Sequence, residues 1–170
     1  MDSEQWTGDK SELEAWNTAP LADLVKHIVE RYHREGRVEM ARLEAQAEEA
    51  VLMEGRNHPV LLEIRDEVER FCTELRAHFR QEERVIFPAI LEQAEGGRPA
   101  LPLEPVKLLE DEHVAAAGLL TRIRALTEGF QPPEGARAVQ RKLFETLQIL
   151  AHSLGRHIYL ENNILFKRIS

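Results

Sequence analysis

The sequence predicts an all-α fold, an up-down-up-down four-helix bundle with a short N-terminal arm. Glycine and proline gather in a few clusters and leave four stretches of roughly 25 to 35 residues between them. These stretches are rich in Ala, Leu, Glu, Arg and Gln and have few β-branched runs, which favours helices over strands. Apolar residues recur along each stretch in alternating steps of three and four, as in the seam of a helical bundle.

Composition limits the classes of partner. The chain has 170 residues, enough for one domain, and its formal charge of −8 argues against nucleic acid or an anionic membrane as a partner. The longest apolar run is far too short to span a bilayer, and the acidic start MDSEQWTGDK does not resemble a signal peptide, so we expect a cytoplasmic protein. Seven histidines stand beside a single cysteine, Cys72, which excludes a disulfide scaffold and a cysteine-rich metal site.

The glycine and proline clusters set the expected boundaries of the arm and of the helices. Residues 1–17 are read as a loose arm or short docking helix, and residues 18–170 as the bundle. A helix start is expected at 18–20, a turn at 55–59, a loop at 96–105 that includes Pro105, and a second loop at 129–135. Oligomeric state is not indicated by the sequence.

Each predicted seam carries a histidine where an apolar residue is expected. The seams comprise Val29, His33, Gly36, Met40, Leu43, Ala47, Ala50 and Glu54; Leu61, Ile64, Val68, Phe71, Leu75, His78, Glu82, Val85 and Ala89; Val106, Leu109, His113, Ala116, Leu120 and Ile123; and Leu143, Leu147, Leu150, Leu154, His157, Glu161 and Ile164. A buried polar group without a partner costs on the order of 1–3 kcal/mol, so these interruptions need a reason.

The interruptions have the spacing of metal ligands. In two seams a glutamate follows the histidine by four residues, His78 with Glu82 and His157 with Glu161, and residues at that spacing share a helical face. The alternative is a set of core histidines held by glutamates at a frayed seam. That explanation suits one isolated histidine better than four histidines and two glutamates.

Counting along the chain from the predicted turns tests whether these side chains lie at one height, since each helical residue rises about 1.5 Å. The separation of His33 from the turn at 55–59 falls between those of His78 and Glu82 on the other side of that turn. Glu82 and His113 flank the middle of the loop at 96–105 at nearly equal separations. The loop at 129–135 fits less well, because His157 lies much farther beyond it than His113 lies before it; the fourth helix must overhang, or its entry must be non-helical.

Four imidazoles and two carboxylates suit a dinuclear centre. Two metal ions could each take two histidines and share both glutamates as bridges, which leaves room for an oxo or hydroxo bridge or a small diatomic ligand. Mixed ligation of this kind in a bundle is typical of di-iron and di-manganese proteins. Two iron ions are the preferred cofactors, with zinc or manganese as alternatives.

The remaining candidates are placed outside the ligand set. Glu54 would lie about 30 Å from His33 along a straight helix, and His58 lies in a turn. His27 and His152 do not share a face with the ligands, and Cys72 is expected to be an inert buried thiol. Glu30 and Glu110 precede His33 and His113 by one helical turn, so they are candidates for orienting those rings or are ordinary exposed glutamates.

Several segments resemble a known family. HFRQEERVIFP, the DEH that ends at His113 and HIYLENNILF resemble the hemerythrin-like HHE cation-binding family. WNTAPLADLVKHIVERYHREGR, residues 16–37, resembles the C-terminal di-iron domain of the bacterial RIC (repair of iron centres) proteins. The resemblance implies a hemerythrin-like bundle with His33, His78, Glu82, His113, His157 and Glu161 as ligands. RIC proteins also carry an N-terminal domain with adjacent cysteines, whereas no cysteine precedes Cys72 here.

The resemblance implies a non-haem di-iron protein for iron–sulfur cluster repair or the response to nitric oxide and oxidative stress, with iron–sulfur proteins as partners. One alternative is a carrier or sensor that binds O2 or NO without turnover. The other is an interaction module that the metal only stabilises. Whether the protein is an enzyme is left open.

Overall fold

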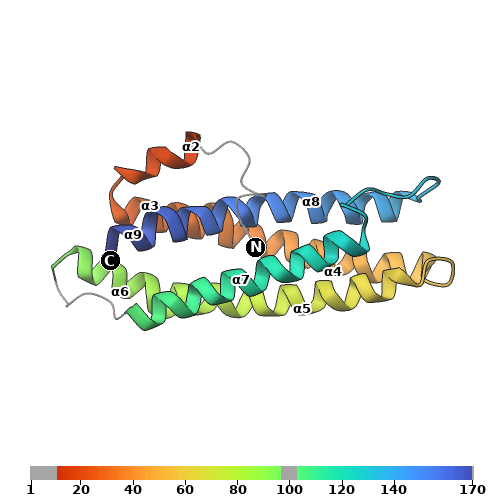
Figure 1. Cartoon of the computed structure of the whole chain (residues 1–170), viewed down its shortest axis with the longest axis horizontal. Coiled ribbons are helices and arrows are strands. Elements are labelled where there is room, and N and C mark those ends of the chain that lie inside the picture. Colours follow the sequence, from red (N-terminus) through yellow and green to blue (C-terminus); the bar gives the residue numbers. More distant parts are fainter. Residues whose placement is uncertain (1–10, 97–102, 170) are drawn as a thin grey trace.

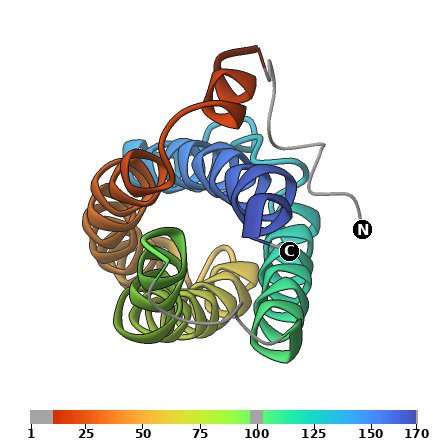
Figure 2. The ribbon, with the colours of Figure 1, turned by 90° about the vertical axis from the view of Figure 1, so that its left-hand side faces the viewer.

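Four long helical arms run side by side and enclose one core (Figures 1 and 2). The computed structural model describes residues 11–96 and 103–169. Three of the arms are interrupted by a π-helical segment. In chain order the arms are α3 (Leu21–His27), η2 (Ile28–Arg34) and α4 (Glu35–Glu54); α5 (Val60–Gln81), η3 (Glu82–Ile86) and α6 (Phe87–Ala94); α7 (Leu103–Leu126); and α8 (Ala138–Tyr159), η4 (Leu160–Leu165) and α9 (Phe166–Ile169).

The bundle is therefore all-α, as the sequence predicts. Helix α4 lies beside both α5 and α8, and α5 also lies beside α7. No helix in the described part of the chain is long and apolar enough to cross a membrane.

The N-terminal residues that the structure describes pack on one end of this bundle. They form α2 (Ser11–Glu14) and the 3-10 turn η1 (Ala15–Asn17). Leu13 is buried among apolar residues of the surrounding arms, and the Arg168 guanidinium donates a hydrogen bond to the Trp16 carbonyl at 2.9 Å. The segment thus docks through both apolar burial and a polar contact.

The helix ends lie where the glycine and proline clusters predict them, with one exception. Pro20 precedes α3, and α4 and α5 are separated by residues 55–59. Pro105, which the sequence places in a loop, instead lies in the first turn of α7, where a missing backbone N–H removes no helical hydrogen bond. Residues 97–102 of that predicted loop lie outside the described residues.

The poor height match at the last turn is resolved by an overhang of α8. Helix α7 ends at Leu126, and the chain turns through Glu128, Gly129 and Phe130, all with positive φ, before α8 begins at Ala138. Arg137 Nε lies 2.8 Å from Glu54 Oε1 at the end of α4, so α8 starts level with the far end of the bundle. Both features expected from the sequence are therefore present: the fourth helix overhangs the third, and the chain that leads into it is non-helical.

The core is divided into two apolar clusters with a polar layer between them. The larger cluster includes Met40, Phe71 and Leu147, and the smaller one includes Leu24, Ile90 and Ile164. The layer between them consists of His33, His78, Glu82, His113, His157 and Glu161, all buried.

The π-helical segments shift the buried face by one residue. The regular seam predicts Val85 and Ala89 as core residues, but Val85 is 59% exposed, and Ile86 and Ile90 are buried in their place. The backbone explains this, because the Phe87 N–H donates to the Glu82 carbonyl five residues earlier. In the first arm, η2 similarly buries Ile28 and leaves the predicted Val29 only half-buried.

Candidate metal centre

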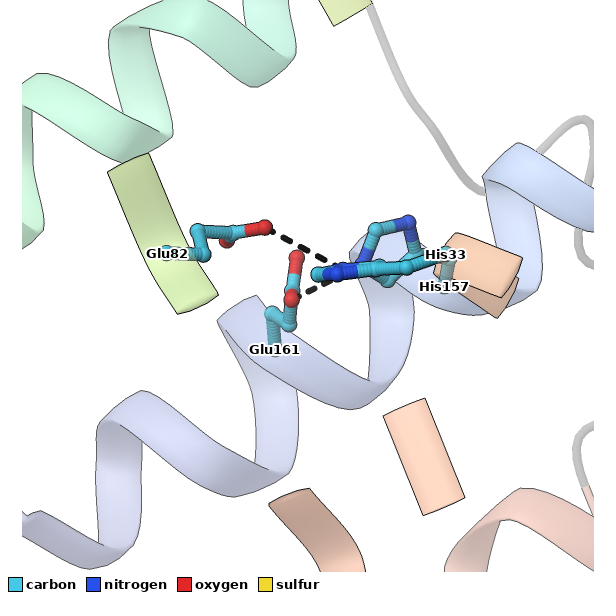
Figure 3. Close-up of side chains that lie close together, drawn as sticks. All are labelled: His33, Glu82, His157 and Glu161. Carbon is cyan, nitrogen blue, oxygen red and sulfur yellow. Dashed lines mark hydrogen bonds and ion pairs between the residues drawn. The ribbon is translucent and has the colours of Figure 1, made fainter. Parts of the chain in front are cut away.

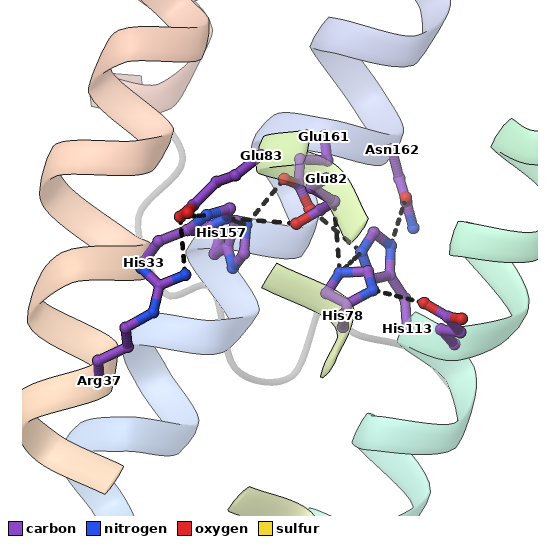
Figure 4. A network of polar contacts seen from close by, with 10 residues as sticks. His33, Arg37, His78, Glu82, Glu83, His113, His157, Glu161 and Asn162 are labelled. Carbon is purple, nitrogen blue, oxygen red and sulfur yellow. Dashed lines mark hydrogen bonds and ion pairs between the residues drawn. The ribbon is translucent and has the colours of Figure 1, made fainter. Parts of the chain in front are cut away.

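The six side chains predicted as ligands meet at one place from all four arms (Figure 4). His33 lies within η2, and His113 lies in the middle of α7. The two histidine–glutamate pairs each cross the junction into a π-helical segment: His78 is in α5 with Glu82 in η3, and His157 is in α8 with Glu161 in η4.

These side chains form two groups of four that share both glutamates. The first group is His33, Glu82, His157 and Glu161, and the second is His78, Glu82, His113 and Glu161; in each, one potential ligand atom per residue lies within 4.8 Å of all the others. The Nε2 atoms of His33 and His157 are 3.1 Å apart, and those of His78 and His113 are 3.0 Å apart. Two nitrogen ligands about 2.1 Å from one ion and at right angles to each other would be about 3.0 Å apart.

Glu82 faces one histidine of each group. Its Oε2 lies 3.3 Å from His33 Nε2, and its Oε1 lies 3.3 Å from His78 Nε2. Figure 3 shows the first of these contacts. One carboxylate oxygen is therefore directed at each group, the arrangement of a bridging carboxylate.

Glu161 repeats this arrangement from the opposite arm. Its Oε1 lies 2.8 Å from His157 Nε2, and its Oε2 lies 3.1 Å from His113 Nε2. The two glutamates thus span both histidine pairs, and each pair meets one oxygen from each glutamate.

Buried oxygen atoms without hydrogen bonds show that the donor set fits metal ions. Among the described residues, neither oxygen of Glu82 and not Oε2 of Glu161 has a hydrogen-bond partner, although both side chains are fully buried. Leaving a buried acceptor unsatisfied costs about 1–3 kcal/mol, more when the group is charged. Divalent cations between the two glutamates would satisfy these atoms, and imidazole with carboxylate is a donor set suited to iron, manganese or zinc.

Three of the histidines are oriented by a hydrogen bond from their outer nitrogen. Nδ1 of His33 donates to Glu83 Oε1 at 2.8 Å, and the Arg37 guanidinium donates to the same oxygen at 2.9 Å. Because Glu83 can only accept, Nδ1 of His33 carries the proton and the lone pair of Nε2 faces the centre.

The outer nitrogens of His78 and His113, in the other half of the centre, have different hydrogen-bond partners. Nδ1 of His78 donates to Glu112 Oε2 at 2.7 Å, and Nδ1 of His113 donates to Asn162 Oδ1 at 2.8 Å. Both contacts again leave Nε2 directed inward as a ligand atom.

Aromatic rings enclose the His33 and His157 side of the centre. The Phe79 ring is stacked on His33 at 4.1 Å, and the Tyr32 ring is stacked on His157 at 5.5 Å. Phe87 lies behind His33 at 5.6 Å.

Burial and neighbouring charges shift the pKa values of His78, Glu161 and His157, and the direction differs between the two histidines. Burial alone would lower the pKa of His78, but Glu82, Glu161 and Glu112 outweigh it and raise the pKa to about 9. Burial would raise the pKa of Glu161, yet contacts with His157 and His113 hold it well below its usual range. Burial is the largest influence on His157 and lowers its pKa, so that imidazole is neutral and ready to bind a cation.

The residues that the sequence excludes from the ligand set lie elsewhere. Glu54 is buried at the far end of the bundle beside Arg137, and His58 is in the turn before α5. His27 is stacked on Trp16 and meets the Tyr32 ring edge-on, and His152 is exposed.

Of the two alternatives offered for Glu30 and Glu110, the structure supports ordinary exposed glutamates. The outer nitrogens of His33 and His113 are held instead by Glu83 and Asn162, which the sequence does not single out. A signal is present in retrospect, because Glu83 and Asn162 each directly follow one of the two shared glutamates in a π-helical segment. The wider turn of such a segment lets two adjacent residues both reach the centre.

A cavity of about 290 Å3 lies between α5 and α7 and reaches the centre from outside. It is lined by Leu75, His78, Glu112, His113, Ala115 and Leu154, among others. A small molecule that enters it meets the His78 and His113 half.

Comparison with known proteins gives the family. The model of the hemerythrin HHE cation-binding domain matches residues 24–169. The chain is 35% identical over 153 residues to the iron–sulfur cluster repair protein YtfE of Edwardsiella ictaluri, which covers 90% of this chain and 67% of the relative. It is 31% identical to the YtfE of Pectobacterium carotovorum, covering 97% of this chain and 73% of the relative. The chain therefore belongs to the hemerythrin HHE cation-binding domain family.

Proposed function

We propose that this protein is a di-iron protein that serves iron–sulfur cluster repair under nitrosative or oxidative stress. His33 and His157 would hold one iron ion and His78 and His113 the other, with Glu82 and Glu161 as bridges. The observation that carries this proposal is that each glutamate directs one oxygen at each histidine pair. The name of the YtfE relatives supports the repair function.

The chain's own residues provide the binding and the electrostatics. Bound iron would supply a centre that changes oxidation state and binds small ligands. The two glutamates supply two negative charges that offset part of the charge of two cations, while Glu83, Glu112 and Asn162 fix the rings. Imidazole and carboxylate ligands hold iron without a thiolate, which is consistent with a site that both binds and releases it.

Two measurements test the proposal in sequence. Protein purified from iron-replete cells should contain about two irons per chain, which metal analysis of the purified protein measures. The ferrous protein should then restore activity to an enzyme whose iron–sulfur cluster has been damaged by nitric oxide. Metal content near zero, together with thermal stability that a chelator does not change, would contradict the metal site.

The cavity between α5 and α7 favours a second function, the binding of O2 or NO without turnover. It gives an uncharged diatomic molecule a path to His78 and His113. Reversible changes in the visible spectrum on addition of NO or O2, with no recovery of the damaged enzyme, would favour this carrier or sensor over repair.

A further inference from the structure

The two halves of the centre differ in how well the protein encloses them. His33 and His157 are 0% and 1% exposed, and their rings are covered by Phe79, Phe87 and Tyr32. Ligand exchange on that side would require these rings to move apart.

The cavities also indicate that the His33 and His157 half of the centre is the more enclosed one. A hollow of about 560 Å3 beside the N-terminal segment is not lined by His157, and the separate cavity that His157 does line, with Tyr32, Gly36 and Phe79, is only about 10 Å3. Roughly 10–15 Å3 is the least that holds one water molecule, so the cavity beside His157 has no room to spare. The cavity of about 290 Å3 beside His78 and His113 has room for several.

The outer hydrogen bonds also differ between the halves. Glu83, which holds His33, is itself fixed by Arg37, and the Arg37 guanidinium lies over the Phe79 ring at 5.5 Å. Glu112, which holds His78, has a side chain 36% exposed and lines the open cavity. One histidine is therefore held by a braced carboxylate and the other by a carboxylate at a solvent-accessible opening.

From these differences we infer that His78 and His113 form the exchangeable half of the centre, with the α5–α7 cavity as the path and Glu112 as the carboxylate at its mouth. His33 and His157 form the retained half. This inference rests on the proposed function, and it identifies which half would supply iron to a damaged cluster.

Because one half of the centre is expected to exchange iron faster than the other, iron release should have two kinetic phases. Protein loaded anaerobically with two equivalents of Fe(II) is mixed with excess ferrozine, a coloured ferrous chelator, and absorbance is followed with time. We expect one equivalent in each phase, with rates that differ by about tenfold or more, since outer hydrogen-bond partners alone change metal affinity by about 10–100-fold.

A matched pair of variants identifies the halves. Glu112→Gln weakens the hydrogen bond to His78 and should accelerate the fast phase by about tenfold while the slow phase is unchanged. Glu83→Gln makes the same chemical change beside His33 and should accelerate only the slow phase.

A second pair tests the path. Ala115 is an exposed helical residue that lines the cavity, so Ala115→Leu narrows it and should slow the fast phase by about tenfold, which corresponds to about 1.4 kcal/mol of barrier. Ala41→Leu, at an exposed position of α4 away from the cavity, is the control and should leave both phases unchanged. Circular dichroism of each variant checks that the fold is retained.

The outcomes separate this inference from the proposed function. Release of both equivalents in a single phase, or a fast phase altered by Glu83→Gln and not by Glu112→Gln, would overturn the inference while the di-iron site stands. Two phases in a protein that does not restore a damaged enzyme would uphold the inference and refute repair. A protein that binds no iron would overturn both.

Discussion

The bridging position of Glu82 can be tested by replacement with leucine, an apolar side chain of similar length. The Glu82 side chain is fully buried, and neither oxygen has a hydrogen-bond partner among the described residues. Removing one partner of a buried charged pair costs about 3–5 kcal/mol when the other charge is left unpaired, but His78 can release its proton and become neutral once Glu82 is gone. We therefore expect metal-free Glu82→Leu protein to fold, with a stability below that of the metal-free wild type by no more than about 3–5 kcal/mol.

Metal increases the difference in stability between the wild type and the variant. A cation present at about one hundred times its Kd stabilises the folded wild type by about 2.7 kcal/mol. At about 2–4 °C per kcal/mol for a chain of this size, Tm should rise by roughly 5–11 °C. The variant loses one oxygen ligand from each half of the centre at once, so we expect little or no shift and less than two bound ions.

The assay is thermal unfolding followed by circular dichroism, with and without Fe(II) under anaerobic conditions, together with metal analysis. Glu54→Leu is the matched control, because Glu54 is also a buried seam glutamate but lies at the far end of the bundle beside the largely exposed Arg137. It should keep the full metal-induced shift. A Glu82→Leu protein that retains two ions and the full shift would refute the bridging arrangement.

Four further predictions concern His78, Gly36 and Cys72. Because the pKa of His78 is raised to about 9, metal binding must displace its proton at neutral pH; iron affinity should rise from pH 7 to 9, and calorimetry in buffers of different ionisation enthalpy should detect the released proton. By the same linkage, the stability that His78 gives the metal-free protein should be complete below about pH 6.5 and lost as pH rises through 9, measured by urea unfolding. Gly36→Leu should destabilise the protein by about 1–3 kcal/mol, because even a Cβ at Gly36 would lie 3.3 Å from the Phe79 ring; an unchanged urea midpoint would contradict this contact. Burial raises the pKa of the Cys72 thiol to about 12, so it should react with a thiol reagent only after unfolding, and rapid labelling of the native protein would be the contrary result.

The regular parts of the bundle could be predicted from the sequence because their periodicity is uninterrupted. In α7 every predicted seam residue from Val106 to Ile123 is buried, and in α5 the seam holds from Leu61 to His78. The convergence of six ligand positions follows from the same rule, since residues on the inner faces of four parallel or antiparallel helices must meet if their heights agree.

The prediction failed where the backbone departs from the regular helix. Val85 and Ala89 continue the pattern of α5 in the sequence, yet Ile86 and Ile90 are buried, because η3 adds one residue to the turn after Glu82. Neighbouring apolar residues at Val85 and Ile86 support either register equally well. Periodicity alone therefore does not reveal the shift.

The positions of these shifts connect fold to site. His33 lies within η2, Glu82 begins η3 and Glu161 lies within η4, whereas α7, which carries His113, is a regular helix throughout. A π-helical turn lengthens the helix by one residue and is less stable than an α-helical one, so three of them at one level require compensation. The compensation is that adjacent side chains, such as Glu82 with Glu83, both reach the centre, one toward the metal position and the other to the outer nitrogen of a histidine. Adjacent residues of an α-helix diverge by about 100°, yet Glu112 and His113 of the regular α7 also divide these two functions, so a π-helical turn eases this division of roles without being required for it.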